Sequence, residues 1–148
     1  MKPLNIPLEE FLRPFFSPAE RVCLRVFDDR KTGAFKGAKL ECEAGKIAAM
    51  EDSLKKHNAQ NRGIYFVINY GGHEDTEITR INAQFVECDE KSIEDQLAAI
   101  GQFALEPSLI VRTKKSLHTY WLMKDAKVES FRRVQKRLIA HFTGDRTI

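Results

Sequence analysis

The chain has 148 residues, of which 43% are hydrophobic and 30% charged, and a formal net charge of +3. This mixture indicates a compact folded protein and excludes a disordered tail. The longest apolar run, residues 64–68, is far shorter than the ~20 residues that a membrane helix needs, and the N-terminus lacks the hydrophobic stretch of a secretory signal. We therefore expect a cytoplasmic protein with no membrane partner.

The first third of the chain is predicted to be an αβ segment. Residues 7–16 contain a short amphipathic stretch that ends at a proline, and residues 22–27 and 38–42 have the composition of strands. Residues 46–57 have helical periodicity. Residues 63–69, rich in β-branched and aromatic residues, are predicted to form a strand.

The second half of the chain is more regular. Residues 83–89 are predicted to form a strand, and Ser92 begins a capping-box pattern for a helix that Pro107 stops. Two further strands are expected at residues 108–113 and 117–123, and a helix at residues 127–142. This order, β-α-β-β-α, predicts an α+β fold with a ferredoxin-like or RRM-like split β-α-β sheet that lacks its last strand.

We expect residues 1–62 to be an N-terminal αβ lead-in packed on a catalytic sheet formed by residues 63–148. Because the chain ends soon after its last predicted helix, we expect the sequence to be a fragment with a truncated C-terminal strand. The strand at 63–69 is an alternative cover for the open edge of that sheet.

Cysteine and histidine spacing argues against a structural zinc and against a disulfide framework, because no Cys-x-x-Cys pair is present. No two histidines have metal-ligand spacing on one helix. We therefore expect any metal to be held by oxygen ligands. The cysteines and histidines whose spacing argues against such sites are Cys23, Cys42, Cys88, His57, His73, His118 and His141.

Charge is unevenly divided along the chain. Residues 111–137 carry nine Lys or Arg against two acids, so this segment is +7 and the remainder is −4. Such a basic segment suits a polyanionic partner, and it equally suits a solvated helix face.

Acidic side chains alternate along the predicted strand at 83–89. Phe85, Glu87 and Asp89 share one face of it, whereas Val86 and Cys88 face the other way. In a ferredoxin-like sheet the first and third strands are neighbours, so the face with Glu87 and Asp89 is expected to coincide with that of His118 and Tyr120. Paired carboxylates suit hard divalent cations, although each residue in isolation has an ordinary structural explanation.

Two motifs resemble a known family. The run Phe-Val-Glu87-Cys-Asp89-Glu, followed later by Val-Arg-Thr-Lys-Lys-Ser116-Leu-His118-Thr-Tyr-Trp, looks like the first two motifs of the archaeo-eukaryotic primase (AEP) superfamily. The resemblance covers residues 63–148. It is nearest to the primase-polymerase domains of plasmid, phage and prophage replication proteins, which are often fused to a helicase.

The resemblance implies a catalytic role for Glu87, Asp89 and His118. Glu87 and Asp89 would hold Mg²⁺ or Mn²⁺, and Ser116 and His118 would contact the triphosphate of an incoming NTP or dNTP. Lys114, Lys115 and Arg112 would add positive charge. A third acid of the family is expected beyond residue 148 or, less favoured, at Asp145, so the isolated chain could be inactive.

Nucleic-acid contacts are expected from aromatic and basic residues. Tyr120 shares the face of His118 and is therefore the better candidate for base stacking. Trp121 lies on the opposite face of the strand, which is expected to be buried in the core. Template backbone contacts are expected from Arg132, Arg133, Lys136 and Arg137 of the last helix. Arg80 and Asn82 are weaker candidates for nucleotide or template contact.

Three functions follow from these patterns. The first is a DNA primase or primase-polymerase domain that acts on a single-stranded DNA template by two-metal nucleotidyl transfer, with a helicase domain as a further expected partner. The alternative is a non-catalytic, RRM-like module that binds single-stranded nucleic acid. A rolling-circle endonuclease is disfavoured because it would need two closely spaced histidines.

Overall fold

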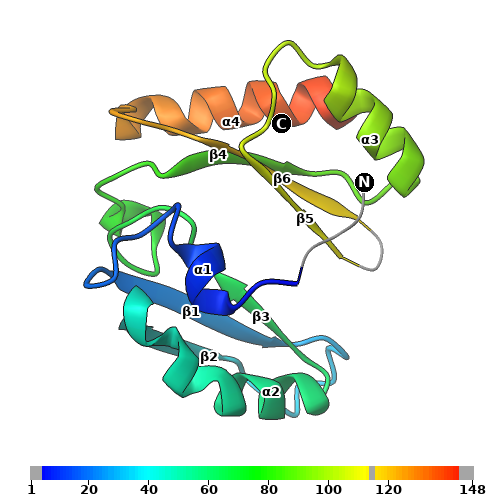
Figure 1. The fold of residues 1–148 in the computed structure, drawn as a ribbon. Coiled ribbons are helices and arrows are strands. Elements are labelled where there is room, and N and C mark those ends of the chain that lie inside the picture. The colour runs from blue at the N-terminus through cyan, green and yellow to red at the C-terminus, as the bar shows by residue number, and fades with distance from the viewer. Residues whose placement is uncertain (1–4, 114–115, 144–148) are drawn as a thin grey trace. The chain divides into compact units, whose positions relative to one another are not determined.

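The computed structural model describes residues 5–113 and 116–143. The chain divides into two compact units between Arg80 and Ile81, and each unit contains its own three-stranded antiparallel sheet (Figure 1). The fold is therefore α+β, as the sequence predicts. The division lies after the expected position at residues 62 and 63, because the strand that follows residue 62 pairs within the first sheet.

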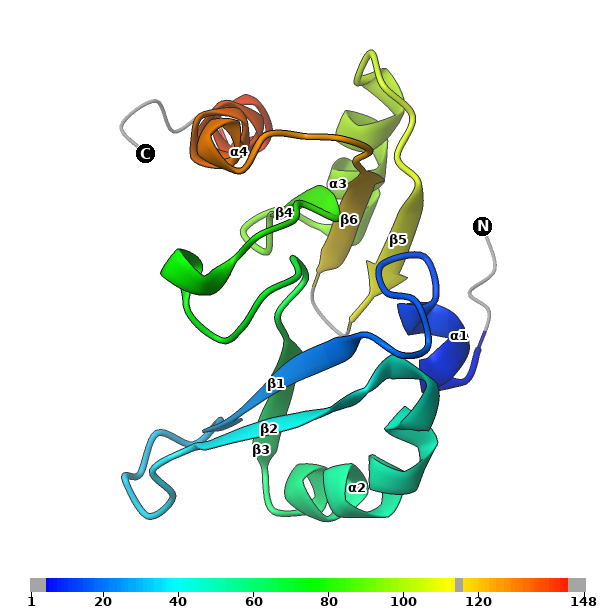
Figure 2. The same cartoon turned by 90° about the vertical axis from the view of Figure 1, so that its left-hand side faces the viewer.

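The first unit contains a sheet in the order β2-β1-β3. The strands of this sheet are labelled in Figure 2. Its elements in chain order are α1 (Leu8–Leu12), β1 (Arg21–Asp28), β2 (Ala38–Glu43), the 3₁₀ helix η1 (Ala44–Met50), α2 (Glu51–Ala59), β3 (Arg62–Phe66) and the short 3₁₀ helix η2 (Asp75–Glu77). The expected helix at 46–57 is thus a 3₁₀ turn that continues into an α-helix. The alternative in which the strand at 63–69 covers the second sheet is wrong, because β3 pairs with β1.

Strand β1 separates two chemically different faces. Val22, Leu24 and Val26 are buried on one face, as alternation along a half-buried strand requires. The opposite face carries Cys23 and Arg25. This second face is where β1 presents its polar side chains.

The second unit has the order β4-β6-β5. Its elements are β4 (Ala83–Glu87), α3 (Ile93–Gln102), β5 (Leu109–Arg112), β6 (Leu117–Leu122) and α4 (Val128–Thr143). The β-α-β-β-α order is therefore confirmed, and so is the pairing of its first and third strands. Helix α3 begins where predicted, since the Ser92 Oγ accepts a hydrogen bond of 3.1 Å from the Asp95 N–H.

Both helices of the second unit pack on one face of its sheet. The core joins side chains from β4, β6, α3 and α4, namely Val86, Ile100, Leu117, Trp121, Leu138 and Phe142. The indole N–H of Trp121 donates to the Leu105 carbonyl at 3.1 Å, so the polar atom of this core side chain is satisfied. The prediction that Val86 and Trp121 point into the core is confirmed. Glu87 and His118 lie on the opposite face of the sheet.

The open edge of β4 is covered by a side chain of α4. Gln135 donates from Nε2 to the Phe85 carbonyl at 2.6 Å, and its Oε1 accepts from the Phe85 N–H at 3.3 Å and from the Gln84 side chain at 2.8 Å. Gln135 thus takes the two backbone bonds that a further strand would make. None of the helices in residues 5–113 and 116–143 has the length and apolar character needed to cross a bilayer.

Candidate active site

Glu87 and His118 lie opposite each other in adjacent strands. They are register partners in the β4–β6 ladder, and His118 Nε2 lies 3.2 Å from Glu87 Oε1. The Glu87 side chain is about half exposed and that of His118 is 28% exposed. The expectation that these two residues share one face is therefore confirmed, and both remain open to a ligand.

Ser116 joins this pair from the turn before β6. Its Oγ donates a hydrogen bond of 2.9 Å to Glu87 Oε1. Thr113 fixes the turn, because its Oγ1 accepts from the Ser116 N–H at 3.0 Å and also donates to the Ser116 carbonyl at 3.1 Å. The sequence reasoning missed Thr113, whose only signal is a hydroxyl three residues before Ser116.

Asp89 does not lie in the strand. Strand β4 ends at Glu87, and Asp89 follows as an exposed residue of the turn that leads to α3, a position that suits aspartate. The alternation argument therefore holds for Glu87 but does not extend to Asp89. The position of Asp89 in space is set by the turn, and its role as a metal ligand stays a prediction.

Other candidate residues surround the site to different degrees. Arg112 is exposed at the end of β5, where it is the register partner of Leu117. Lys114, Lys115 and Asp145 lie outside the described residues. The basic side chains of α4 are solvent-exposed, as a role in backbone binding requires, and these are Arg132, Arg133, Lys136 and Arg137.

Tyr120 is buried, with 4% of its surface exposed. It is the register partner of Phe85, and the two ring centroids are 6.2 Å apart. Burial, together with the negative charge of Glu87, raises the pKa of Tyr120 to about 12. Stacking on a base would require this ring to be uncovered first, so the structure does not favour that role.

Arg80 and Asn82 have structural contacts. The Arg80 guanidinium pairs with the Glu20 carboxylate, donates to the Phe15 carbonyl at 3.3 Å and lies over the Tyr70 ring. Asn82 is buried, and its carbonyl accepts from the Met123 N–H at 2.9 Å. Arg80 is therefore an exposed residue held by contacts within the fold, whereas Asn82 is buried rather than available on the surface.

The donor set of the site suits a hard divalent cation. Glu87 offers carboxylate oxygens, and Asp89, two residues later, offers another exposed carboxylate. The Ser116 hydroxyl donates to Glu87, and the His118 ring lies beside the same carboxylate, so both side chains are placed to meet phosphate oxygens on the same cation. The residues present therefore fit a metal-bound triphosphate.

We compared the sequence and the structure of this chain with those of known proteins. No protein-family profile and no curated protein sequence matches the chain. Among solved structures, the AEP domain of the primase-polymerase of cyanophage S-2L has a TM-score of 0.72 and 24% identity, over 90% of this chain and 70% of that one.

Two structures of the primase RepB′ are also similar. One has a TM-score of 0.60 and 23% identity, over 87% of this chain and 40% of that one. The other, its catalytic domain in complex with initiator DNA, has a TM-score of 0.60 and 21% identity, over 91% and 65%. The chain thus spans less than two thirds of either RepB′ chain, and it has the fold of AEP primase-polymerase domains.

Proposed function

We propose that this chain is the catalytic domain of a DNA primase or primase-polymerase that transfers nucleotides to a primer 3′-hydroxyl on a single-stranded DNA template. The observation that carries the proposal is the convergence of Ser116 and His118 on one oxygen of Glu87. This convergence occurs in a sheet with the fold of primase-polymerase domains.

Glu87 and Asp89 are the proposed ligands of Mg²⁺ or Mn²⁺. When bound, two such cations would activate the primer hydroxyl and stabilise the departing pyrophosphate. The half-exposed carboxylate of Glu87 is accessible to a nucleotide-bound cation. The neighbouring donors keep Glu87 Oε1 oriented before any ligand arrives.

Ser116 and His118 are the proposed triphosphate contacts. The backbone of Ser116 is held in place by Thr113, whose Oγ1 accepts from the Ser116 N–H. The His118 ring lies at the register position of Glu87. Both side chains would turn from the Glu87 oxygen to a phosphate oxygen when an NTP or dNTP binds, since a hydroxyl and an imidazole N–H can each donate to an anionic acceptor. Lys114 and Lys115 are proposed to add positive charge nearby.

The proposed partners are a single-stranded DNA template and an NTP or dNTP. One RepB′ structure contains initiator DNA, which supports a DNA partner for this fold. The exposed basic side chains of α4 are the proposed contacts to the template backbone. A helicase domain in the same replication protein is a further proposed partner.

The test is nucleotide binding and primer synthesis by the protein and its variants. We expect Glu87→Gln and Asp89→Asn each to reduce Mn²⁺-dependent dNTP binding, measured by calorimetry, and to abolish synthesis on single-stranded DNA. His118→Ala should weaken nucleotide binding by about 10- to 100-fold, because it removes a hydrogen bond to a charged group. Glu90→Gln, a change in the adjacent exposed acid, is the matched control and should behave as the wild type.

Two results would contradict the proposal. Normal metal-dependent nucleotide binding in both Glu87→Gln and Asp89→Asn would remove the catalytic assignment. Metal-independent binding of single-stranded DNA that survives the double substitution, without any nucleotide binding, would instead identify a non-catalytic nucleic-acid module.

A further inference from the structure

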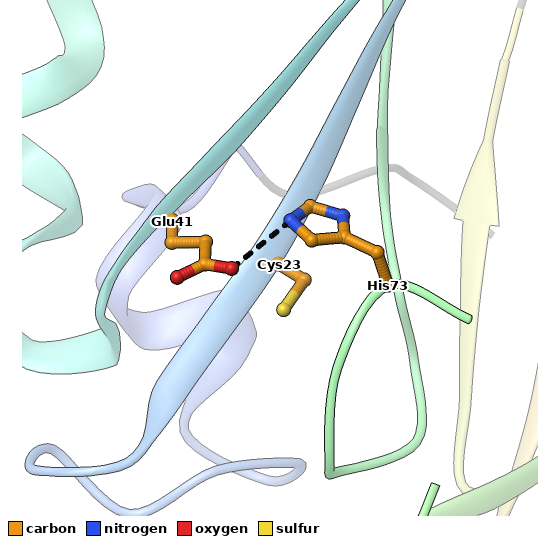
Figure 3. A group of neighbouring side chains, drawn as sticks. All are labelled: Cys23, Glu41 and His73. Carbon is orange, nitrogen blue, oxygen red and sulfur yellow. Dashed lines mark ion pairs between the residues drawn. The ribbon is translucent and has the colours of Figure 1, made fainter. Parts of the chain in front are cut away.

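Three potential metal ligands meet on the polar face of the first sheet. Cys23 of β1 and Glu41 of β2 are direct register partners, so their side chains share that face. His73 comes from the loop after β3, and its ring lies beside both of them (Figure 3). Ligand atoms of the three residues all lie within 4.8 Å of one another.

The His73 ring is buried and lies beside the Glu41 carboxylate without forming a well-aligned hydrogen bond to it. Only 9% of its side chain is exposed, and within the described part of the chain neither ring nitrogen has a hydrogen-bond partner. Leaving buried polar atoms without hydrogen-bond partners destabilises a fold. A metal ion coordinated by one of these nitrogens would satisfy that nitrogen. It would lie where the Glu41 carboxylate and the Cys23 thiol are also within reach.

We propose that Cys23, Glu41 and His73 bind a Zn²⁺ ion. Sulfur and imidazole ligands select zinc over the hard cations that an all-oxygen site prefers. His73 Nε2 lies 3.3 Å from Glu41 Oε1. Two atoms bonded to tetrahedral zinc at about 2.0–2.2 Å are themselves about 3.4 Å apart, so the nitrogen and oxygen are already at a ligand-to-ligand distance.

Arg21 holds the outer side of this site. Its Nη1 lies 3.6 Å from Glu41 Oε2, the oxygen that does not face His73. Its Nη2 donates to the Gly71 carbonyl at 2.8 Å. Arg21 therefore orients both the carboxylate and the loop that carries His73, as residues around a metal site commonly do.

The backbone conformation of the loop after β3 places His73 beside the sheet. Gly71 has φ +150°, and a Cβ at this position would clash with the Glu77 carbonyl oxygen. Only glycine fits such a close approach, so the chain can turn back and place His73 over the sheet. The half-exposed Glu41 side chain leaves the site open to solvent on one side, where an ion can enter and a water molecule can take the fourth position.

The proposed zinc site departs from an expectation from the sequence. Spacing along the chain argued against cysteine or histidine ligands, because the three residues lie far apart in sequence. Pairing of β1 with β2 and the return of the loop bring them together. The proposal does not depend on the primase assignment, because none of its residues belongs to the Glu87 site.

The experiment uses Co²⁺ as a spectroscopic substitute for Zn²⁺. We expect the full chain to bind one Co²⁺ with a sulfur-to-cobalt charge-transfer band, and Zn²⁺ to displace it. His73→Gln and Cys23→Ser should each abolish the band, and Glu41→Gln should weaken Co²⁺ affinity by at least about tenfold. Cys42→Ser is the matched control, because Cys42 follows Glu41 in β2 and points to the opposite face.

The sulfur band separates this site from the carboxylate site, which has no thiol ligand. Circular dichroism of each variant checks its fold, and the half-exposed Glu41 position keeps the test informative if Cys23→Ser is unstable. Absence of the band in the wild-type protein would overturn the proposal, and so would loss of the band in Cys42→Ser with retention in His73→Gln. The group would then be a histidine–glutamate pair beside a buried thiol.

Discussion

Glu20 and Arg80 illustrate how much one ion pair shifts a single titratable group. The Arg80 Nη2 donates to Glu20 Oε1 at 2.9 Å, and the Ser17 N–H donates to the same oxygen at 2.8 Å. These donors, the guanidinium first, lower the pKa of Glu20 to about 2 despite its partial burial. A carboxyl whose pKa is lower in the folded state stabilises the fold above its unfolded pKa.

Glu20→Gln should therefore destabilise the protein near neutral pH, by about 1.5–3 kcal/mol for a hydrogen bond to a charged group. The difference should shrink as the pH falls from about 4.5 towards 2, because the wild-type carboxylate is protonated over that range. Urea unfolding of both proteins at several pH values measures this. Glu106→Gln, in an exposed loop, is the control. A pH-independent difference would contradict the assigned cause.

The helices and strands agree with those predicted from the sequence where one face of the element is buried. Alternation predicted β4, β5 and β6, and the Ser92 cap predicted the start of α3. The predicted strand extended to Asp89, whereas β4 ends at Glu87. Alternation of side chains along a strand does not show at which residue the backbone turns away from its neighbouring strand. It also could not show that Gln135 of α4 serves as the edge partner of β4, since that contact joins residues far apart in sequence.

Gln135→Leu should destabilise the protein by about 1–3 kcal/mol, because the Phe85 N–H and carbonyl lose their partners. The exposed edge should also promote association. Urea unfolding and size-exclusion chromatography measure the two effects. Gln102→Leu, at the exposed end of α3, is the matched control and should change neither property. Equal behaviour of the two variants would show that the Gln135 contact contributes nothing.

Charge is a property of the whole molecule, and it is segregated along this chain. The segment at 111–137 carries +7 while the total is +3, and the basic residues of α4 within it are exposed. Such a surface attracts phosphate regardless of base sequence. Its contribution to binding must therefore depend on ionic strength.

Neutralising three of these residues together, in Arg132→Gln/Arg133→Gln/Lys136→Gln, should weaken single-stranded DNA binding and reduce the slope of log K against log salt by about 2 if each contacts a phosphate. Fluorescence anisotropy at several salt concentrations measures this slope. Lys46→Gln/Lys55→Gln/Lys56→Gln removes the same charge from the other unit and is the control. An identical slope in both triple variants would mean that only net charge matters.

The sequence by itself determined the order of the elements of the second unit, the face shared by Glu87 and His118, and the burial of Trp121, because strand and helix periodicities are local properties of the chain. Tertiary structure alone decided that β3 joins β1, that Tyr120 is covered, and that Gln135 closes the edge of β4. It also brought Cys23, Glu41 and His73 together. These outcomes depend on contacts between distant segments, for which sequence spacing carries no signal.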